Sequence, residues 1–336
     1  MNVKSPLKTM QKQAGDYLLI KHVVPATNLE SLVNGYILNC RCEGKSPKTI
    51  AIYEMVLRNF LWFCRDNGYP TEPLKLSAVH IRPFFWYLVS ETNRWSGKSA
   101  RTKKPASKST VHDYYRALRT FFNWLEREAM IHENPFSNIK PPKTEKKVIE
   151  ALTPDEVARL MRCCSGKTTF DVRNTAILSL LLDSGLRVSE LAALIVDDIN
   201  MSTGSILVRH GKGGKQRVVH IGVKAQKALW KYVAIYRKSE SKSLFINRTG
   251  EPLELAGVKM LVKRLGERAG VSVSPHKLRH TFAISYLRAG GDVFSLQYLL
   301  GHNTLQMTQR YLQSLNADDA INAHRKFSPL DHIIGR

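Results

Sequence analysis

The chain has 336 residues, and its 51 Lys and Arg against 28 Asp and Glu give a formal net charge of +23. Its length predicts about two domains, and its 43% hydrophobic content is ample for packed cores. The positive charge favours a polyanionic partner such as nucleic acid. No apolar run approaches the ~20 residues of a membrane-spanning helix, so no membrane partner is expected.

The start of the chain and its cysteines indicate a cytoplasmic protein. Lys21 interrupts the short apolar stretch near the N-terminus, so a signal peptide is not expected. None of the five cysteines has partners at the spacing of a zinc site. We therefore expect free thiols in a reducing compartment.

The first half of the chain is helical in pattern. Residues 1–27 are a basic, weakly patterned arm, and residues 28–133 carry four amphipathic stretches. These cover, in chain order, about 29–41, 47–67, 78–90 and a segment that starts near 109. Ser46 is the predicted N-cap of the second helix. The apolar stripes predict a small bundle, with Trp86 and Trp124 in its core rather than stacked on bases.

A basic loop separates the third and fourth helical stretches. Its cations are Arg94, Lys98, Arg101, Lys103, Lys104 and Lys108. A run of this kind is usually a solvated surface loop, but within a nucleic-acid-binding bundle it is better interpreted as a set of phosphate contacts.

The segment 134–152 is rich in Pro and Lys and is the predicted linker. Thr153 then caps a new helix, which opens a second domain at 153–315. Within it, SILVRH and QRVVHI alternate on either side of GKGGK and predict a β-hairpin. The fold class is therefore mainly α, with one small antiparallel β-sheet in the C-terminal domain. GKGGK is not a nucleotide-binding P-loop, because a strand follows it instead of a helix.

Polar residues punctuate this second half in a fixed order. They are Arg187 in GLRVSEL, Lys212 in the hairpin, His276 and Arg279 in PHKLRH, His302 in LLGHN, and Tyr311 in QRYL. Each alone is uninformative, but together they could hold a phosphodiester with cations and attack it with a phenol. Ser274 and Pro275 start a helix that places His276 and Arg279 in its first turn, where backbone N–H groups also face an anion.

These motifs resemble the tyrosine site-specific recombinases and integrases, over about residues 28–325. The resemblance implies an Xer-like organisation, in which an N-terminal helical core-binding domain and a catalytic domain form a C-shaped clamp on duplex DNA. It implies cleavage through a 3′-phosphotyrosine on Tyr311, followed by rejoining to another strand, without metal or ATP. Integration, excision or resolution of DNA, including mobile elements, would be the outcome.

Chemistry assigns roles to the remaining residues. Arg187 and Arg279 each offer a planar fork to nonbridging oxygens and lower the cost of ionising the phenol, and His302 donates a further hydrogen bond. Lys212 protonates the leaving 5′-oxygen, and His276 assists proton removal from Tyr311. Glu190, one turn after Arg187, either orients an arginine or is a plain surface residue.

Three alternatives remain open. A type IB topoisomerase uses similar chemistry as a monomer, and a DNA-binding regulator would lack catalysis. A zinc site could use His276, His280 and His302, but the surrounding cations suit an anion better, so no metal or other cofactor is expected and His280 is assigned to packing or support.

The resemblance also bears on assembly and base recognition. It implies a homotetramer in the synaptic complex, assembled from a chain that is monomeric when free. Residues 316–336 predict a short capped helix with an apolar stripe, which docks on its own domain or on a neighbouring protomer. Candidates for reading bases include the helix near Lys259, Lys263 and Arg264.

Overall fold

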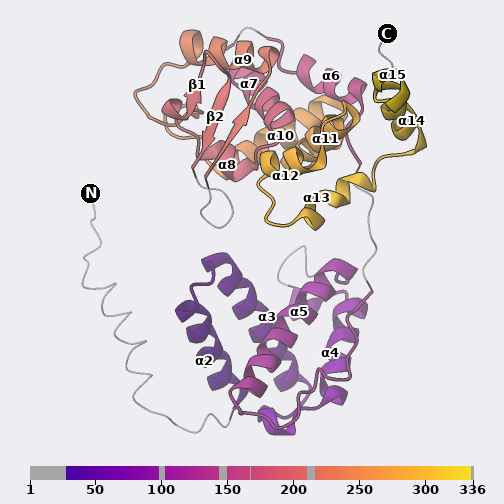
Figure 1. Ribbon diagram of the computed structural model, residues 1–336. Helices are drawn as coiled ribbons and strands as arrows, with labels where there is room; N and C mark the ends of the chain where they lie inside the picture. Colours follow the sequence, from indigo (N-terminus) through magenta and orange to yellow (C-terminus); the bar gives the residue numbers. More distant parts are fainter. Residues whose placement is uncertain (1–27, 98–102, 144–149, 167, 210–215, 334–336) are drawn as a thin grey trace. The chain divides into compact units, whose positions relative to one another are not determined.

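The computed structural model describes residues 28–97, 103–143, 150–166, 168–209 and 216–333. The predicted N-terminal arm, 1–27, lies outside the described residues. The chain divides into two compact units, residues 1–146 and 147–336, and each is described by itself. The N-terminal unit is a helical bundle and the C-terminal unit combines helices with a small sheet (Figure 1).

The N-terminal unit is built on four long helices. They are α2 (Leu29–Cys42), α3 (Pro47–Asp66), α4 (Ala78–Ser90) and α5 (Lys108–Arg127). Two 3₁₀ turns, Pro73–Lys75 and Arg94–Gly97, flank α4. The Ser46 side chain accepts a hydrogen bond from Thr49 N, which confirms the predicted cap. The last helix begins one residue before Ser109, because Ser107 is its cap.

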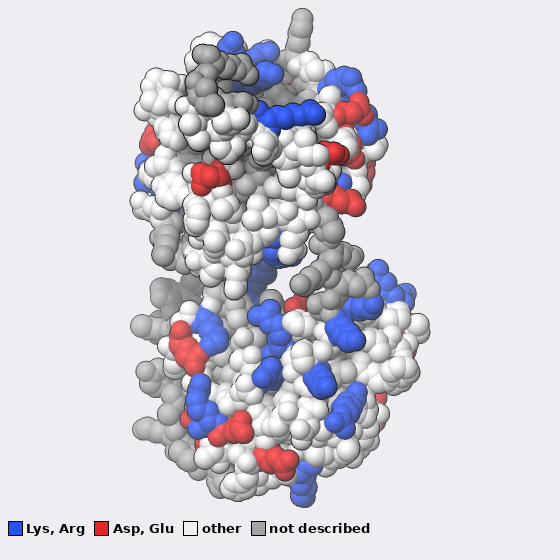
Figure 2. All heavy atoms as spheres, turned by 45° about the vertical axis from the view of Figure 1, so that its right-hand side comes forward, with Lys and Arg blue, Asp and Glu red and all other residues white. Residues whose placement is uncertain are grey.

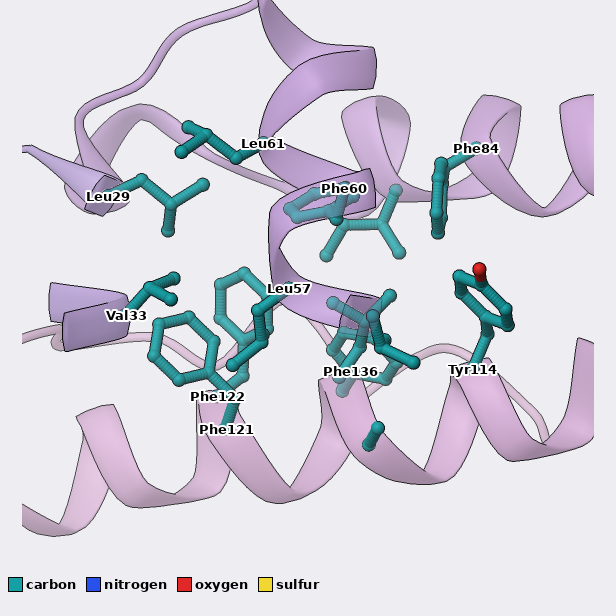
Figure 3. Close-up of a cluster of buried hydrophobic side chains, with 14 of the residues drawn as sticks. Leu29, Val33, Leu57, Phe60, Leu61, Phe84, Tyr114, Phe121, Phe122 and Phe136 are labelled. Carbon is teal, nitrogen blue, oxygen red and sulfur yellow. The ribbon is translucent and has the colours of Figure 1, made fainter. Parts of the chain in front are cut away.

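Aromatic side chains fill the core of this bundle. Phe60, Phe84, Phe121 and Phe122 are fully buried and pack edge to face, with ring centroids 5.1 Å apart for Phe60 and Phe84 (Figure 3). Such pairs fix the helices against one another. The surface cations of this unit are therefore carried on helices that pack around a common core.

One core prediction is wrong. Trp124 is 8% exposed and lies in the core, whereas Trp86 is 70% exposed on the outer face of α4. The helix buries Ile81, Phe84 and Leu88, and a residue two positions from Phe84 lies about 200° around the helix axis, away from that face.

The segment expected as a linker contributes to the N-terminal core. Phe136 and Ile139 are buried in it, and the Tyr115 hydroxyl donates to Ile139 O at 2.9 Å. Residues 144–149 lie outside the described residues.

The C-terminal unit has a three-stranded antiparallel sheet in the order β1-β2-β3. Its strands are β1 (Ile199–Asn200), β2 (Ser205–Val208) and β3 (Arg217–His220). The register places Val208 opposite Arg217, which confirms the predicted hairpin. The helices are α6 (Pro154–Arg162), α7 (Thr169–Ser184), α8 (Val188–Ala192), α9 (Val223–Trp230), a π-helical stretch Lys231–Tyr236, α10 (Leu255–Ala269), α11 (Pro275–Arg288), α12 (Val293–Leu300), α13 (Leu305–Leu312), α14 (Ala317–Lys326) and α15 (Pro329–Ile333).

Helix α7 lies at the centre of this unit and contacts both α9 and α11. Ala176, Ile177, Leu180 and Leu181 on it are fully buried. Thr153 caps α6 with a reciprocal bond from its own N–H to Glu156, as predicted. The packed helices hold the ends of α8, α11, α12 and α13 together.

The tail helix α14 has no buried residue. Ile321 and Phe327 on its apolar stripe are 51% and 50% exposed. Its contacts with the rest of the unit include an ion pair from Arg288 to Asp319 at 3.1 Å and a bond from Lys326 to Ala289 O. Among the described residues, no helix is long and apolar enough to cross a membrane.

Candidate active site

Arg279 is a buried cation at the centre of the site. Ser274 caps α11 by accepting from Lys277 N, with Pro275 in the first turn, so Arg279 follows one turn later and is only 4% exposed. Its guanidinium donates to Gly185 O and Leu300 O, both at 2.6 Å. Burial and the nearby Arg187 lower the pKa of Arg279 to about 10, which leaves it cationic at neutral pH.

Glu190 lies between two arginines. It accepts from Arg187 Nη1 at 2.8 Å, and Arg217 binds both of its carboxylate oxygens at 2.9 and 2.8 Å. Burial alone would raise the pKa of Glu190, but hydrogen bonds from Arg217 and Arg187 outweigh it, and the pKa is lowered. With 4% of its surface exposed, Glu190 is not a plain surface residue.

Arg187 occupies the N-cap position of α8, directly after the turn at Gly185. Its Nη2 donates to Gly301 O at 3.0 Å, and its side chain is 19% exposed. Gly301 adopts a left-handed φ of 60°, and a Cβ there would stand 3.0 Å from Arg217 Nη1, so this corner favours glycine. The corner at Gly301 in the LGH motif thus positions Arg187 and Arg217 as well as His302.

Tyr311 projects from α13 into this cluster. Its side chain is 3% exposed, and its oxygen lies 3.0 Å from His280 Nδ1. The ring stacks on that of His302, with an interplanar angle of 6°. Burial raises the pKa of Tyr311 above its ordinary value, although the positive charge of Arg279 acts to lower it. The arginines act in the predicted direction, but burial outweighs them and the phenol is protonated.

His302 connects Arg279 to α13. Its Nε2 lies 3.1 Å from Arg279 Nη2 and its Nδ1 lies 2.9 Å from Thr308 Oγ1. Burial, with the charge of Arg279, lowers the pKa of His302 to about 4, so the ring is neutral. Since a guanidinium only donates, Nε2 accepts and Nδ1–H donates to the threonine. In this state His302 supports Arg279, rather than offering a donor at Nε2.

His276 and His280 lie one turn apart on α11, with ring centroids 6.4 Å apart. Of the two, His280 reaches the phenol oxygen of Tyr311, a contact closer than the packing or support assigned from the sequence. Within the described residues, no group of three or more His, Cys, Asp or Glu is arranged to hold a metal ion.

Lys212 lies outside the described residues, as does Lys215. The flanking strands β2 and β3 are described, and they pair from Ser205 with His220 to Val208 with Arg217. Lys98 and Arg101 of the N-terminal basic loop also lie outside the described residues.

Comparisons with known proteins agree with this arrangement. The phage integrase family matches residues 150–317, and the N-terminal SAM-like domain of phage integrases matches residues 32–132. The tyrosine recombinase XerC of Bacillus pumilus is 38% identical over 296 residues, covering 85% of this chain and 92% of the relative. XerD of Oceanobacillus iheyensis is 32% identical, covering 84% and 93%.

The chain is a tyrosine recombinase of the phage integrase family. Its fold matches solved structures at lower identity. The Tn1549 transposon integrase bound to transposon right-end DNA is 19% identical with a TM-score of 0.71, over 90% of this chain and 99% of that one. A lambda integrase dimer bound to a COC′ core site gives 0.67 at 19% identity, over 86% and 97%.

The basic loop of the recombinase separates into two kinds of cation. Lys103, Lys104 and Lys108 are exposed. In the view of Figure 2, the N-terminal unit shows more Lys and Arg than Asp and Glu on its surface. Arg94 is 6% exposed, and its guanidinium donates to Lys104 O at 3.2 Å. The expectation that Arg94 contacts phosphate is therefore corrected, because its buried guanidinium is hydrogen-bonded to the backbone of the loop.

Two residues of the recombinase site were not singled out from the sequence. Arg217 starts β3 and shares a face with the buried Val219, so a cation at an inward strand position was the available signal. Thr308 is fully buried beside His302, and nothing in its local sequence marks it.

Proposed function

We propose that this recombinase, a site-specific enzyme that cleaves and rejoins duplex DNA, uses Tyr311 as its nucleophile. The observation that carries the proposal is the buried phenol of Tyr311 stacked on the ring of His302, which lies 3.1 Å from Arg279 in a cluster that also holds Arg187. A phosphodiester under in-line attack gathers negative charge on its nonbridging oxygens, and fixed guanidinium donors stabilise that charge.

The reaction conserves the energy of the broken bond. Attack by the phenol oxygen forms a 3′-phosphotyrosine and releases a 5′-hydroxyl, and a different 5′-hydroxyl reverses the step. We assign protonation of the leaving oxygen to Lys212, and stabilisation of the phosphate to Arg187 and Arg279, while His302 holds Arg279 in place through its Nε2. Glu190 orients Arg187. Proton removal from Tyr311, assigned to His276 from the sequence, falls to a histidine of α11. Neither ATP nor a metal is required by this scheme.

A nicked suicide duplex tests the nucleophile. Its sequence would be a site selected from random duplexes by binding to the full chain. We expect an SDS-resistant protein–DNA adduct whose nucleotide remnant maps to Tyr311 by mass spectrometry, with a yield unaffected by EDTA. A remnant on another residue would overturn the assignment. Relaxation of a supercoiled plasmid without two-site recombination would instead indicate a topoisomerase.

The general acid has its own test. Lys212→Ala should slow cleavage of an ordinary duplex by about 100-fold or more, and a duplex with sulfur at the 5′-bridging position should restore the rate, since a thiolate leaves without a proton. Arg187→Ala should not be rescued, because its charge serves the nonbridging oxygens. If Lys215→Ala is rescued and Lys212→Ala is not, the role belongs to Lys215.

DNA contacts outside the active site involve exposed cations. We propose that Lys98, Arg101, Lys103, Lys104 and Lys108 bind backbone phosphates, and that α10, with exposed Lys259, Lys263 and Arg264, contributes to base recognition. The cellular setting we propose is the cytoplasm, where the chain would integrate, excise or resolve DNA, including mobile elements.

The tail favours assembly in trans. Leu330 and Ile333 on α15 are 63% and 79% exposed. Ile321 and Phe327 are half-exposed, with the Phe327 ring lying against Gly290, and polar contacts to Arg288 and Ala289 also hold the tail to its own unit. We propose that four protomers exchange these helices in the synaptic complex, starting from free monomers.

Deletion from Asp318 onward should leave single-site DNA binding within about twofold and reduce two-site recombination by at least about tenfold, because the exchanged contact is lost. A full-length chain with Ile321→Ser and Phe327→Ser should reproduce this defect. The matched variant Arg288→Gln, which weakens the ion pair to Asp319 and leaves the capping box of α14 intact, should recombine normally. Normal recombination by the truncated chain would contradict the exchange without touching the catalytic assignment.

A further inference from the structure

The phenol oxygen of Tyr311 lies beside a neutral imidazole and within reach of the charge of Arg279. His280 Nδ1 is 3.0 Å from it. In the imidazole tautomer that carries its proton on Nε2, Nδ1 accepts the hydrogen of the phenol.

We propose that His280 is the catalytic base that takes the proton of Tyr311 as the phenol attacks the DNA phosphate. This inference rests on the proposed function. It assigns the role of proton acceptor to His280, one turn further along α11 than His276, to which it was assigned from the sequence. The ring of His276 stacks behind His280, with centroids 6.4 Å apart, whereas His280 contacts the reacting atom.

The step balances without an external reactant. The O–H bond of Tyr311 breaks, an N–H bond forms at His280 Nδ1, and the phenolic oxygen bonds to phosphorus. The bond from phosphorus to the 5′-oxygen breaks, and that oxygen takes a proton from the general acid, proposed to be Lys212. Religation runs in reverse, and Tyr311 recovers its proton from His280.

The surroundings of His280 keep this base neutral until DNA binds. Burial, together with the charges of His276, Arg279 and Arg310, lowers its pKa to about 4. His302, at the corner after α12, also faces it. A bound phosphodiester brings negative charge that offsets these cations and raises the basicity of His280.

Chemistry at phosphorus then drives the transfer. As the new P–O bond forms, the phenolic oxygen changes toward an aryl ester oxygen, which has little affinity for a proton. A weak base in contact with it can therefore take the proton in the transition state, although it would not deprotonate the free phenol. Without DNA the proton stays on Tyr311, so the unbound enzyme holds its nucleophile unreactive.

Three variants of the full chain separate a base from a structural histidine. Single-turnover cleavage of the selected nicked duplex would be measured at saturating enzyme. We expect His280→Phe to be slower than wild type by about 100-fold or more at unchanged DNA affinity. His280→Asn should be similarly slow, because its amide oxygen can accept the phenol hydrogen bond but cannot take the proton. His276→Asn is the matched control and should lose less.

An acidic phenol provides the rescue. Fluorinated tyrosine placed at position 311 needs less help to lose its proton, so it should speed cleavage by His280→Phe by about tenfold or more. The same analogue should not rescue Arg279→Ala, whose defect is missing charge. The cleavage rate of wild type should also fall at acidic pH as His280 becomes protonated, and His280→Phe should not show this fall.

Two outcomes would overturn the assignment. Cleavage by His280→Phe within about threefold of wild type would show that no base acts there, and wild-type cleavage by His280→Asn would show that the hydrogen bond alone suffices. If the wild-type chain forms no adduct on Tyr311, the proposed function fails and this inference with it. If wild type forms the adduct on Tyr311 and the His280 variants cleave as fast as wild type, only the assignment of His280 as the base is overturned.

Discussion

Tyr311→Phe should abolish the covalent protein–DNA adduct, with a loss of at least about 10⁴-fold in cleavage, while DNA affinity stays within about twofold of wild type. The phenyl ring preserves the stack on His302 and the buried packing, and only the oxygen is removed. No other group then forms the ester. The measurement is a time course of SDS-resistant adduct on the selected suicide duplex, with affinity from a gel-shift titration.

The neighbouring phenol on α12 is a matched control. Tyr298 is 60% exposed in the same unit, so a freely accessible tyrosine is present near the site's helices. Tyr298→Phe should cleave at the wild-type rate. An adduct that survives in Tyr311→Phe but is lost in the double variant with Tyr298→Phe would show that Tyr298 is the nucleophile and Tyr311 is not. An adduct that survives in the double variant would show that neither tyrosine is the nucleophile.

Local signals in the sequence predicted much of the fold. Ser46 and Thr153 each precede an apolar stripe at helical spacing, and both are caps in the structure. The alternating strands on either side of the glycine-rich loop predicted β2 and β3. These features depend on neighbours within a few residues, which is the range over which a sequence pattern is read directly.

Contacts between distant segments could not be read this way. His280 and Tyr311 are 31 positions apart, and their contact depends on how α11 and α13 pack. Arg217 and Glu190 are 27 apart and pair only because β3 approaches α8. Arg94 looked like its basic neighbours, but the fold of the loop turns it inward. Composition gives no signal for that difference.

Glu190→Ala should be the most destabilising single change in the site. It would leave Arg187 and Arg217 next to one another without their shared carboxylate, and removal of one member of a buried ion pair costs about 3–5 kcal/mol. Hydrogen exchange of peptides from α8 and β3, followed against urea, reports on the C-terminal unit alone. The exposed pair Lys263–Glu267 is the matched control, and Glu267→Ala should cost less than about 1 kcal/mol.

Glu190→Gln separates charge from shape and fixes a pH dependence. The pKa of Glu190 is lowered on folding, so the stability it contributes is fully present above its unfolded value and is lost as the pH falls. Wild type should therefore be more stable than Glu190→Gln near pH 7, by a constant amount, and the gap should narrow below about pH 4.5 as the wild-type carboxylate is protonated. Cleavage should fall in both variants, because Arg187 loses its anchor. Equal stability of wild type and Glu190→Gln at pH 7 would show that the ionic charge of Glu190 contributes nothing to the fold and that its hydrogen bonds account for its whole effect on the two arginines.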